Sequence, residues 1–253
     1  MATLILRLAG PLQAWGSEVK FEVRKTYMEP TKSGIIGLLS AALGRRRDES
    51  IDDLRQLRIG IRVDKEGHLL RDYHVVAPKK VSKKTGPIPF MMVPPLENDR
   101  GKAWITNRYY LSDAIFLVGI ESSDTEFLSI LESALKAPKF PLYLGRRACP
   151  PEFPLLLGIK DSPLLTALTE EPWSVSEWEC TRWENRNNFP NKLRLIIETT
   201  PEDSDTYLQK NDPISFSPYR RQYGFVSLKE LDFMTPKNKK FPHFEHDPMQ
   251  ELR

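Results

Sequence analysis

The segment at residues 77–100 places the strongest constraint on how this chain of 253 residues can fold. It contains prolines at positions 78, 87, 89, 94 and 95, four lysines and the apolar run F-M-M-V at 90–93. Irregular connections of this length are uncommon inside a compact domain. Because strand patterns lie on both sides, we interpret the segment as a protruding arm, apolar at its tip, that contacts RNA or a partner subunit. Disorder is the alternative reading.

The segments on either side of the arm show strand and helix patterns. We predict strands at 3–8, 59–63, 69–76, 104–111, 114–120 and 142–144, with a tight D-K-E-G turn joining the second and third. Helices are expected at 30–44, at 50–58 and at 124–136, the first ending at Gly44. Without the arm, the order resembles a split βαβ pattern. The sequence therefore predicts an α+β, ferredoxin-like domain, whose open sheet face commonly binds RNA.

The chain beyond residue 160 is less regular. It contains Trp173, Trp178 and Trp183, a strand pattern at 193–197 and the stretch P-Y-R-R-Q-Y-G-F at 218–225. We expect residues 161–234 to form a smaller β-rich part of the same unit as residues 1–160. The tryptophans are expected in the core or an interface, and residues 235–253 are expected to be a flexible tail.

Several classes of protein are disfavoured by composition. The longest mostly apolar run, at 35–44, is too short to span a bilayer. Cys149 and Cys180 make neither a metal-ligand pair nor a disulfide framework, which favours the cytoplasm. His243 and His246 are too isolated for a metal site, and no glycine is followed by the Gly-Lys-Ser/Thr of a phosphate loop. We therefore expect no metal and no cofactor.

The loop P-L-Y-L-G-R-R-A-C-P-P at 141–151 is a candidate RNA contact. Gly145 can adopt a positive φ, and Arg146 and Arg147 follow it before a Cys-Pro-Pro stop. Their planar guanidiniums suit phosphate oxygens or base edges, and Tyr143 offers a stacking face. The alternative is that both arginines are solvated turn residues. Since the net charge is only +3, this clustering is more informative than the total charge.

Further candidates lie nearer the N-terminus. Lys32 and Ser33 open the first helix, whose N-terminus is either an anion site or a plain cap. Trp15 either stacks on a base or covers the core. On a strand, Arg71 and Tyr73 share one face, while Asp72 and His74 share the other. His74 is either a general base or a structural histidine.

Five stretches together resemble one protein family. They are L-R-L-A-G-P-L-Q-A-W-G (6–16), P-T-K-S-G-I-I-G-L-L-S-A-A-L-G (30–44), L-R-D-Y-H-V-V (70–76), R-Y-Y-L-S-D-A-I-F (108–116) and Y-L-G-R-R-A-C-P (143–150). Their collinear order resembles the CasD family, the subunits of type I-E CRISPR Cascade that hold the 5′ handle of the guide RNA. The likeness covers about residues 4–160 and is weak beyond them.

The resemblance implies a RAMP-type domain whose thumb corresponds to residues 77–107. It also implies a place at the 5′ end of a ribonucleoprotein complex for antiviral defence, between the large subunit and the first CasC-type backbone subunit. Such a subunit binds the crRNA handle without cutting it, and any contact with target DNA is made through the complex. The implied RNA-contacting residues are Trp15, Lys32, Ser33, Arg71, Tyr73, His74, Arg108, Tyr109, Arg146 and Arg147.

Two other functions remain open at this point. One is a metal-independent endoribonuclease that processes repeat RNA, for which His74, Tyr73 and Lys32 are the candidate groups. The other is a structural adaptor that binds only protein.

Overall fold

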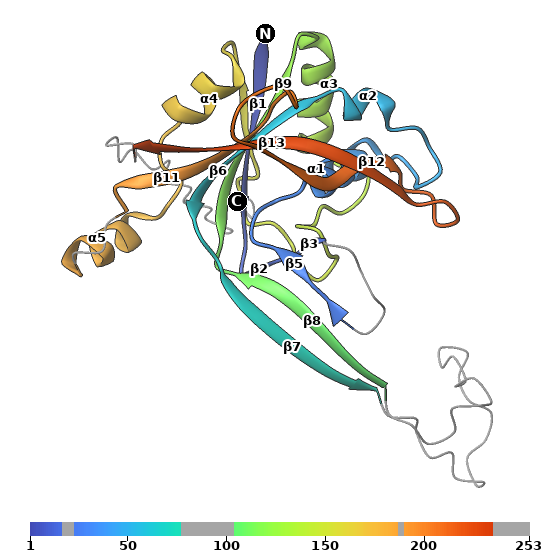
Figure 1. Cartoon of the computed structure of the whole chain (residues 1–253), viewed down its shortest axis with the longest axis horizontal. Coiled ribbons are helices and arrows are strands. Elements are labelled where there is room, and N and C mark those ends of the chain that lie inside the picture. The colour runs from blue at the N-terminus through green and yellow to red at the C-terminus, as the bar shows by residue number, and fades with distance from the viewer. Residues whose placement is uncertain (17–22, 77–103, 187–189, 235–253) are drawn as a thin grey trace, which may run out of the picture.

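The computed structural model describes residues 1–16, 23–76, 104–186 and 190–234. These residues form an α+β structure built on antiparallel strand pairing (Figure 1). Nearly all of the predicted arm and the predicted tail lie outside the described residues. No helix in the described ranges is both long and apolar enough to cross a membrane.

One sheet of seven strands runs through the body, and every neighbouring pair in it is antiparallel. Its spatial order is β10-β1-β9-β6-β11-β13-β12. The C-terminal strands therefore extend the sheet of the N-terminal half. The bounds are β10 Leu156–Lys160, β1 Ala2–Ala9, β9 Ile115–Ser122, β6 Arg58–Lys65, β11 Lys192–Glu198, β13 Gln222–Met234 and β12 Thr206–Ser215.

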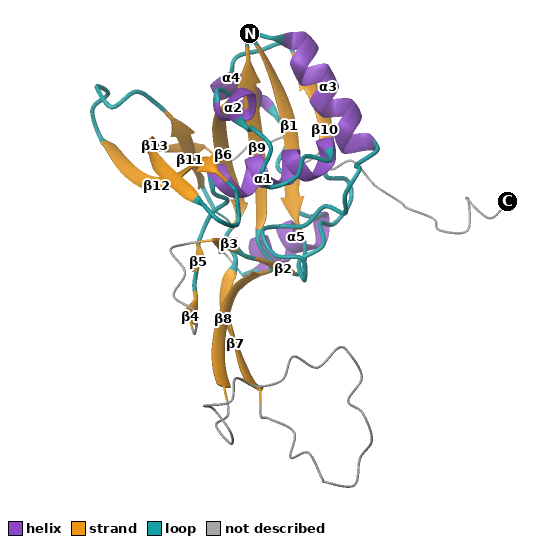
Figure 2. Cartoon of the chain, turned by 90° about the vertical axis from the view of Figure 1, so that its right-hand side faces the viewer, coloured by secondary structure: helices purple, strands orange, loops and turns teal. Residues whose placement is uncertain are grey.

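Helices cover both faces of the central strands, which explains why β1 is apolar almost throughout (Figure 2). On one face, α1 (Lys32–Leu43) and α3 (Thr125–Lys136) pack on the cluster that includes Leu4 and Leu6. On the other, α4 (Leu164–Glu170) packs on Ile5. The predicted starts and stops of the two long helices are confirmed, since Thr31 and Asp124 cap them and Gly44 is left-handed with φ 78°. The short helices are α2 (Asp52–Arg55) and α5 (Glu177–Asn185).

A two-stranded ribbon, β7 (His68–Val76) paired with β8 (Trp104–Ser112), extends away from the body (Figures 1 and 2). We had expected the strands at 59–63 and 69–76 to be joined as a pair by a tight turn, and this was wrong. β6 pairs with β9, whereas β7 pairs with β8, so the chain runs out along β6 and β7 and returns along β8 and β9. Glu66 and Gly67 separate β6 from β7. The return path is interrupted at the same level, between β8 and β9, by Asp113, whose φ is 62°.

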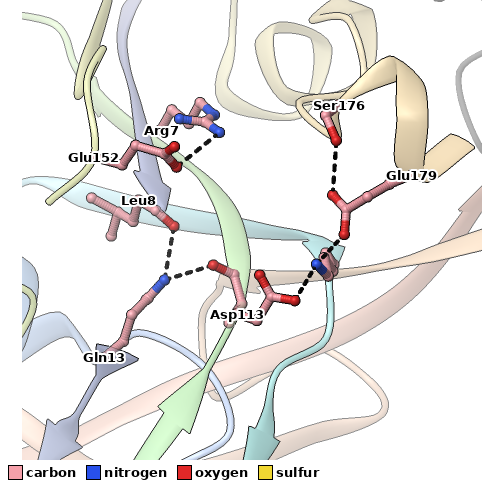
Figure 3. Close-up of polar contacts among 9 residues, drawn as sticks. Arg7, Leu8, Gln13, Asp113, Glu152, Ser176 and Glu179 are labelled. Atoms are coloured by element: carbon pink, nitrogen blue, oxygen red, sulfur yellow. Dashed lines mark hydrogen bonds and ion pairs between the residues drawn. The ribbon is translucent and has the colours of Figure 1, made fainter. Parts of the chain in front are cut away.

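The base of the ribbon is fixed by polar contacts between distant segments (Figure 3). Lys65 pairs with Asp113, Nζ to Oδ2 at 2.6 Å, and with Glu179 of α5. Glu179 also accepts a hydrogen bond from Ser176. Gln13 donates from its amide to the carbonyl oxygens of Leu8 and Ala114, at 3.2 and 2.8 Å. These contacts tie the ribbon to both halves of the body.

Two further expectations need correction. Residues 142–144 do not form a strand, because Leu144 N–H donates to the carbonyl of Cys149 and its own carbonyl accepts from Ala14, which closes a loop. The edge strand is β10 instead. The helix expected at 50–58 is also shorter, since α2 ends at Arg55 and a turn leads into β6 at Arg58.

A fully buried ion pair joins the body to the chain beyond α4. Arg62 donates from Nε and one terminal nitrogen to the two carboxylate oxygens of Asp64, at 2.5 and 2.9 Å. Its remaining donors reach the carbonyl oxygens of Leu168, Glu171 and Pro172, just where α4 ends. All five guanidinium N–H groups are therefore used, and one side chain satisfies carbonyls that the helix end leaves open.

Replacing Asp64 with asparagine should destabilise the protein by about 3–5 kcal/mol, because it leaves the Arg62 guanidinium buried with no counter-charge. Urea denaturation followed by circular dichroism measures this loss. The control is Asp232→Asn, which breaks an exposed pair with Lys192 and should change stability by no more than about 1 kcal/mol. Equal losses in the two variants would contradict the role given to the buried pair.

Candidate nucleic-acid interface

The β7–β8 ribbon presents two chemically different faces, because side chains alternate along a strand. Its register pairs Arg71 with Tyr109, Tyr73 with Asn107, and Asp72 with Arg108. Directly opposed residues of an antiparallel pair lie on the same face. Arg71, Tyr73, Asn107 and Tyr109 thus share what we call the aromatic face, while Asp72, His74 and Arg108 share the opposite, ionic face.

The aromatic face carries a preorganised arginine. Arg71 donates from Nε to Asn107 Oδ1 at 2.9 Å, and its guanidinium carbon lies 5.9 Å from the centre of the Tyr73 ring. The Tyr73 side chain is 53% exposed, so its ring is available to a ligand. Leu69, Val75 and Ile105 are also exposed along this part of the ribbon. The predicted grouping of Arg71 with Tyr73 is confirmed, and together they offer a stacking surface beside a cation.

On the ionic face, His74 and Asp72 are partners of each other. His74 Nδ1 lies 3.2 Å from Asp72 Oδ2, so the histidine has a carboxylate partner that the sequence did not reveal. Arg108 stands between Asp72 of β7 and Arg24 of β4 (Val23–Arg24) in the sheet register. Its Nε is buried and has no hydrogen-bond acceptor in the described part of the chain.

Arg146 has a mainly structural position. Its guanidinium donates to the carbonyl oxygens of Tyr109 and Arg24, at 3.2 and 3.0 Å, and stacks over the Tyr110 ring at 4.7 Å. It therefore holds the loop, β8 and β4 together. The expectation that both arginines of the loop face a ligand stays a prediction for Arg147, which is exposed and makes no hydrogen bond or ion pair within the described ranges.

Gly145 confirms the predicted positive φ, at 82°. A Cβ at this position would lie 1.7 Å from the carbonyl oxygen of Ala14, so the loop backbone rests directly on the segment that follows β1. Cys149 closes the same loop and is buried, and its burial raises the pKa of the thiol. The loop is thus a rigid element that sets the position of Arg147.

Trp15 does not stack on a base in this structure, which corrects its place among the predicted RNA contacts. Its side chain is 0% exposed, and its indole N–H donates to Gln13 Oε1 at 3.1 Å. Its ring lies against α1, so close that a Cβ on Gly34 would be 2.8 Å from it. The alternative reading, a tryptophan that covers the core, is the correct one.

Lys32 and Ser33 do not form an open anion site either. The Lys32 ammonium donates to Glu198 Oε2 at 2.9 Å and to the carbonyl of Leu57 at 3.3 Å. Burial raises the pKa of Glu198, an effect that the neighbouring Lys32 opposes. Ser33 Oγ lies 3.3 Å from the hydroxyl of Thr31, which caps the helix. The plain-cap reading therefore fits, and the lysine is neutralised by a carboxylate from the C-terminal half.

The structure adds two basic residues that the sequence analysis missed. Arg24 and Lys25 are exposed beside β8, and their carbonyls receive the Arg146 guanidinium. The run F-E-V-R-K-T-Y at 21–27 alternates like a strand, and that was the available signal. No group of three or more His, Cys, Asp or Glu side chains in the described ranges could hold a metal ion.

Replacing Gly145 with alanine should destabilise the protein by about 3–5 kcal/mol, at the upper end of single substitutions, because the Ala14 backbone must move. Urea denaturation measures the change. The matched control is Gly158→Ala, where φ is also positive, at 114°, but nothing lies within 4 Å of the added Cβ. Backbone strain alone should cost that control about 1–3 kcal/mol. A loss at Gly145 no larger than at Gly158 would show that the loop does not press on residue 14.

Comparisons with known proteins agree with one another. Residues 3–229 match the family described as CRISPR-associated protein (Cas_Cas5). The CRISPR system Cascade subunit CasD of Escherichia coli (strain K12) is 36% identical over 188 residues, which are 67% of this chain and 77% of that relative.

Solved structures give the same result. A chain of a CRISPR RNA-guided surveillance complex matches with a TM-score of 0.73 and 29% identity, over 93% of this chain and 91% of that one. A crystal structure of a Cas protein matches with a TM-score of 0.63 and 36% identity, over 95% and 97%.

Proposed function

The chain belongs to the Cas5/CasD family of CRISPR Cascade subunits, and from this premise we propose that it binds the 5′ handle of the crRNA in a type I-E complex without cutting it. In this proposal it occupies the 5′ end of a cytoplasmic complex, between the large subunit and the first CasC-type backbone subunit. It thereby serves antiviral defence by holding the guide RNA in place.

The sheet topology supports a RAMP-type, ferredoxin-like assignment for the N-terminal domain. Around α1 and α3, the chain forms β1, β6, β9 and β10 in sequence order, and these strands take the spatial order β10-β1-β9-β6 with antiparallel pairing. This order is the one expected for a split βαβ motif, and so it supports the proposal. We propose that the ribbon is the stem of the thumb of such a domain, and that β11 to β13 are an extension of the same sheet.

The aromatic face of the ribbon is the observation that carries the proposal. It places Arg71, Tyr73 and Tyr109 side by side on an element that projects from the body. Single-stranded RNA is recognised by stacking of splayed bases on aromatic rings and arginine planes. An unpaired handle can meet these requirements, whereas the deep groove of an RNA duplex cannot.

Basic residues beside the ribbon and in the loop at 141–151 supply a route for the phosphates. Arg24, Lys25 and Arg147 are exposed, and Arg146 links the segments that carry them. Such contacts fix the register of the strand without reading its sequence. Binding should therefore weaken as the salt concentration rises, because neutralised phosphates release counterions.

The arrangement of the candidate catalytic groups supports binding without cleavage. Tyr73 and His74 are consecutive in β7, so their side chains point to opposite faces. The Lys32 ammonium is held by Glu198 in the body. A common site would require a base and a cation within reach of the same phosphate, and these three groups do not converge.

Replacing Tyr73 with alanine should weaken binding of handle RNA by roughly 5- to 150-fold, the range for loss of one base stack. Tyr73→Phe should stay close to wild type, because the ring remains. Fluorescence anisotropy with labelled handle RNA, at fixed salt, measures both. Wild-type affinity in the alanine variant would contradict the role of this face.

Cleavage is tested with end-labelled repeat RNA, carrying a native or a scrambled handle, on paired native and denaturing gels. We expect handle-dependent retention of uncut RNA by the chain with its neighbouring Cascade subunits. Specific cutting by the chain alone would instead establish a processing nuclease. If the isolated chain retained no RNA and only completed the complex, the result would favour a protein-only adaptor.

A further inference from the structure

A second basic and aromatic surface lies at the end of the β12–β13 hairpin. The last pair in this hairpin is Ser215 with Gln222, so residues 216–221 form its tip. In Figure 1 the hairpin extends to one side of the body while the β7–β8 ribbon extends below it. The tip therefore belongs to a different part of the molecule from the aromatic face of the ribbon.

The tip exposes an aromatic ring that the fold does not use. The Tyr219 side chain is 99% exposed, and it makes no hydrogen bond or ring contact in the described ranges. Burying an aromatic side chain is among the larger contributions to folding, and here that contribution is absent. Phe216, three residues earlier, packs instead against the core cluster. Phe216 thus anchors the tip, and Tyr219 remains fully available to a ligand.

Arginines flank this ring on the same short segment. Arg220 and Arg221 are exposed, and neither makes an ion pair within the described ranges. The Arg221 guanidinium carbon lies 5.3 Å from the centre of the Tyr223 ring, so the guanidinium is already stacked on an aromatic plane. Phe225, two residues further along the strand and 64% exposed, continues the same face.

The charge around the hairpin favours an anionic ligand at its tip. The carboxylate opposite this region is Asp212, which pairs in the register with Gly224, and Arg55 binds it at 2.6 Å. The loop at the other end of β12, residues 199–205, is acidic and contains Glu202, Asp203 and Asp205. The hairpin is therefore polarised, with its basic charge at the tip.

We propose that residues 218–225, which span the hairpin tip and the start of β13, are a second binding site for single-stranded nucleic acid. Tyr219 and Phe225 stack on bases, and Arg220 and Arg221 contact phosphates. Bases stacked on aromatic rings next to unpaired cations are the usual means by which proteins hold single strands without sequence preference. A duplex keeps its bases stacked inside and cannot use the exposed ring. The strand is either RNA or DNA, since both offer base faces for stacking and phosphates for the arginines.

Anisotropy with the full chain and labelled 12-nucleotide oligo-U and oligo-dT, neither of which contains a handle, tests this proposal. Tyr219→Ala should weaken binding by roughly 5- to 150-fold, while Tyr219→Phe stays within about twofold. Arg220→Ala with Arg221→Ala should reduce the slope of log affinity against log salt by about 1.4, the value for two single-strand phosphate contacts. Phe153→Ala, which removes another exposed ring, is the matched control and should bind like wild type.

The two oligonucleotides distinguish the possible ligands of the tip. A loss with oligo-U alone assigns the site to RNA, a loss with oligo-dT alone assigns it to DNA, and a loss with both assigns it to either strand. Binding by Tyr219→Ala and by the double arginine variant within twofold of wild type overturns the proposal, and would leave the tip as a surface for protein.

Discussion

The long antiparallel pairing of residues 58–76 with residues 104–122 is the constraint on which the rest of the structure depends. Its first part, β6 with β9, forms the middle of the seven-stranded sheet, and its second part, β7 with β8, leaves the body as the ribbon. Because side chains alternate, a slip of one residue would move Arg71 and Tyr73 to the opposite face. The register is fixed where the two parts meet, by Lys65 with Asp113 and Glu179. The fold and the candidate interface therefore share one cause.

Buried charge connects the two halves of the chain. Arg62 of β6 reaches the end of α4 and Asp64, and Lys32 of α1 pairs with Glu198 of β11. The Arg62–Asp64 pair lies within β6, and the Arg62 guanidinium reaches carbonyl oxygens at the end of α4, whereas the Lys32–Glu198 pair joins α1 to a strand beyond the arm. Removing one partner of a buried ion pair destabilises a protein strongly, whereas the intact pair adds little net stability. They make residues 161–234 part of the body that supports the ribbon, and so couple the less regular half of the sequence to the proposed RNA site.

Local patterns predicted most of the elements from the sequence alone. The two long helices, with their caps, and the strands at 3–8, 104–111 and 114–120 are present, since periodicity and capping are encoded over a few residues. The pairing of β6 and β7 was mistaken, because the break at Glu66 and Gly67 looks like a hairpin turn in sequence. Likewise, nothing local distinguishes a buried Arg62 from a solvent-facing strand residue, as its carbonyl acceptors lie more than 100 positions away.

In the candidate site, too, some features follow from local sequence and others depend on the tertiary structure. The shared face of Arg71 and Tyr73 follows from strand alternation. By contrast, Trp15 is buried against α1, and Lys32 and Arg146 bind partners distant in sequence. A residue type that suits RNA, such as tryptophan or lysine near a turn, also suits a core or an ion pair. Only the tertiary structure separates these uses. Arg24 and Lys25 join the site for the same reason, because β4 is brought beside β8.

Photo-crosslinking of handle RNA to this chain within the assembled complex tests the central claim most directly. The handle would carry 4-thiouridine at its uridines, and crosslinked peptides would be located by mass spectrometry. We expect crosslinks on β7 and β8, at Tyr73 and Tyr109 and their neighbours. Crosslinks confined to other parts of the chain, or to other subunits alone, would contradict the claim that the aromatic face of the ribbon holds the handle.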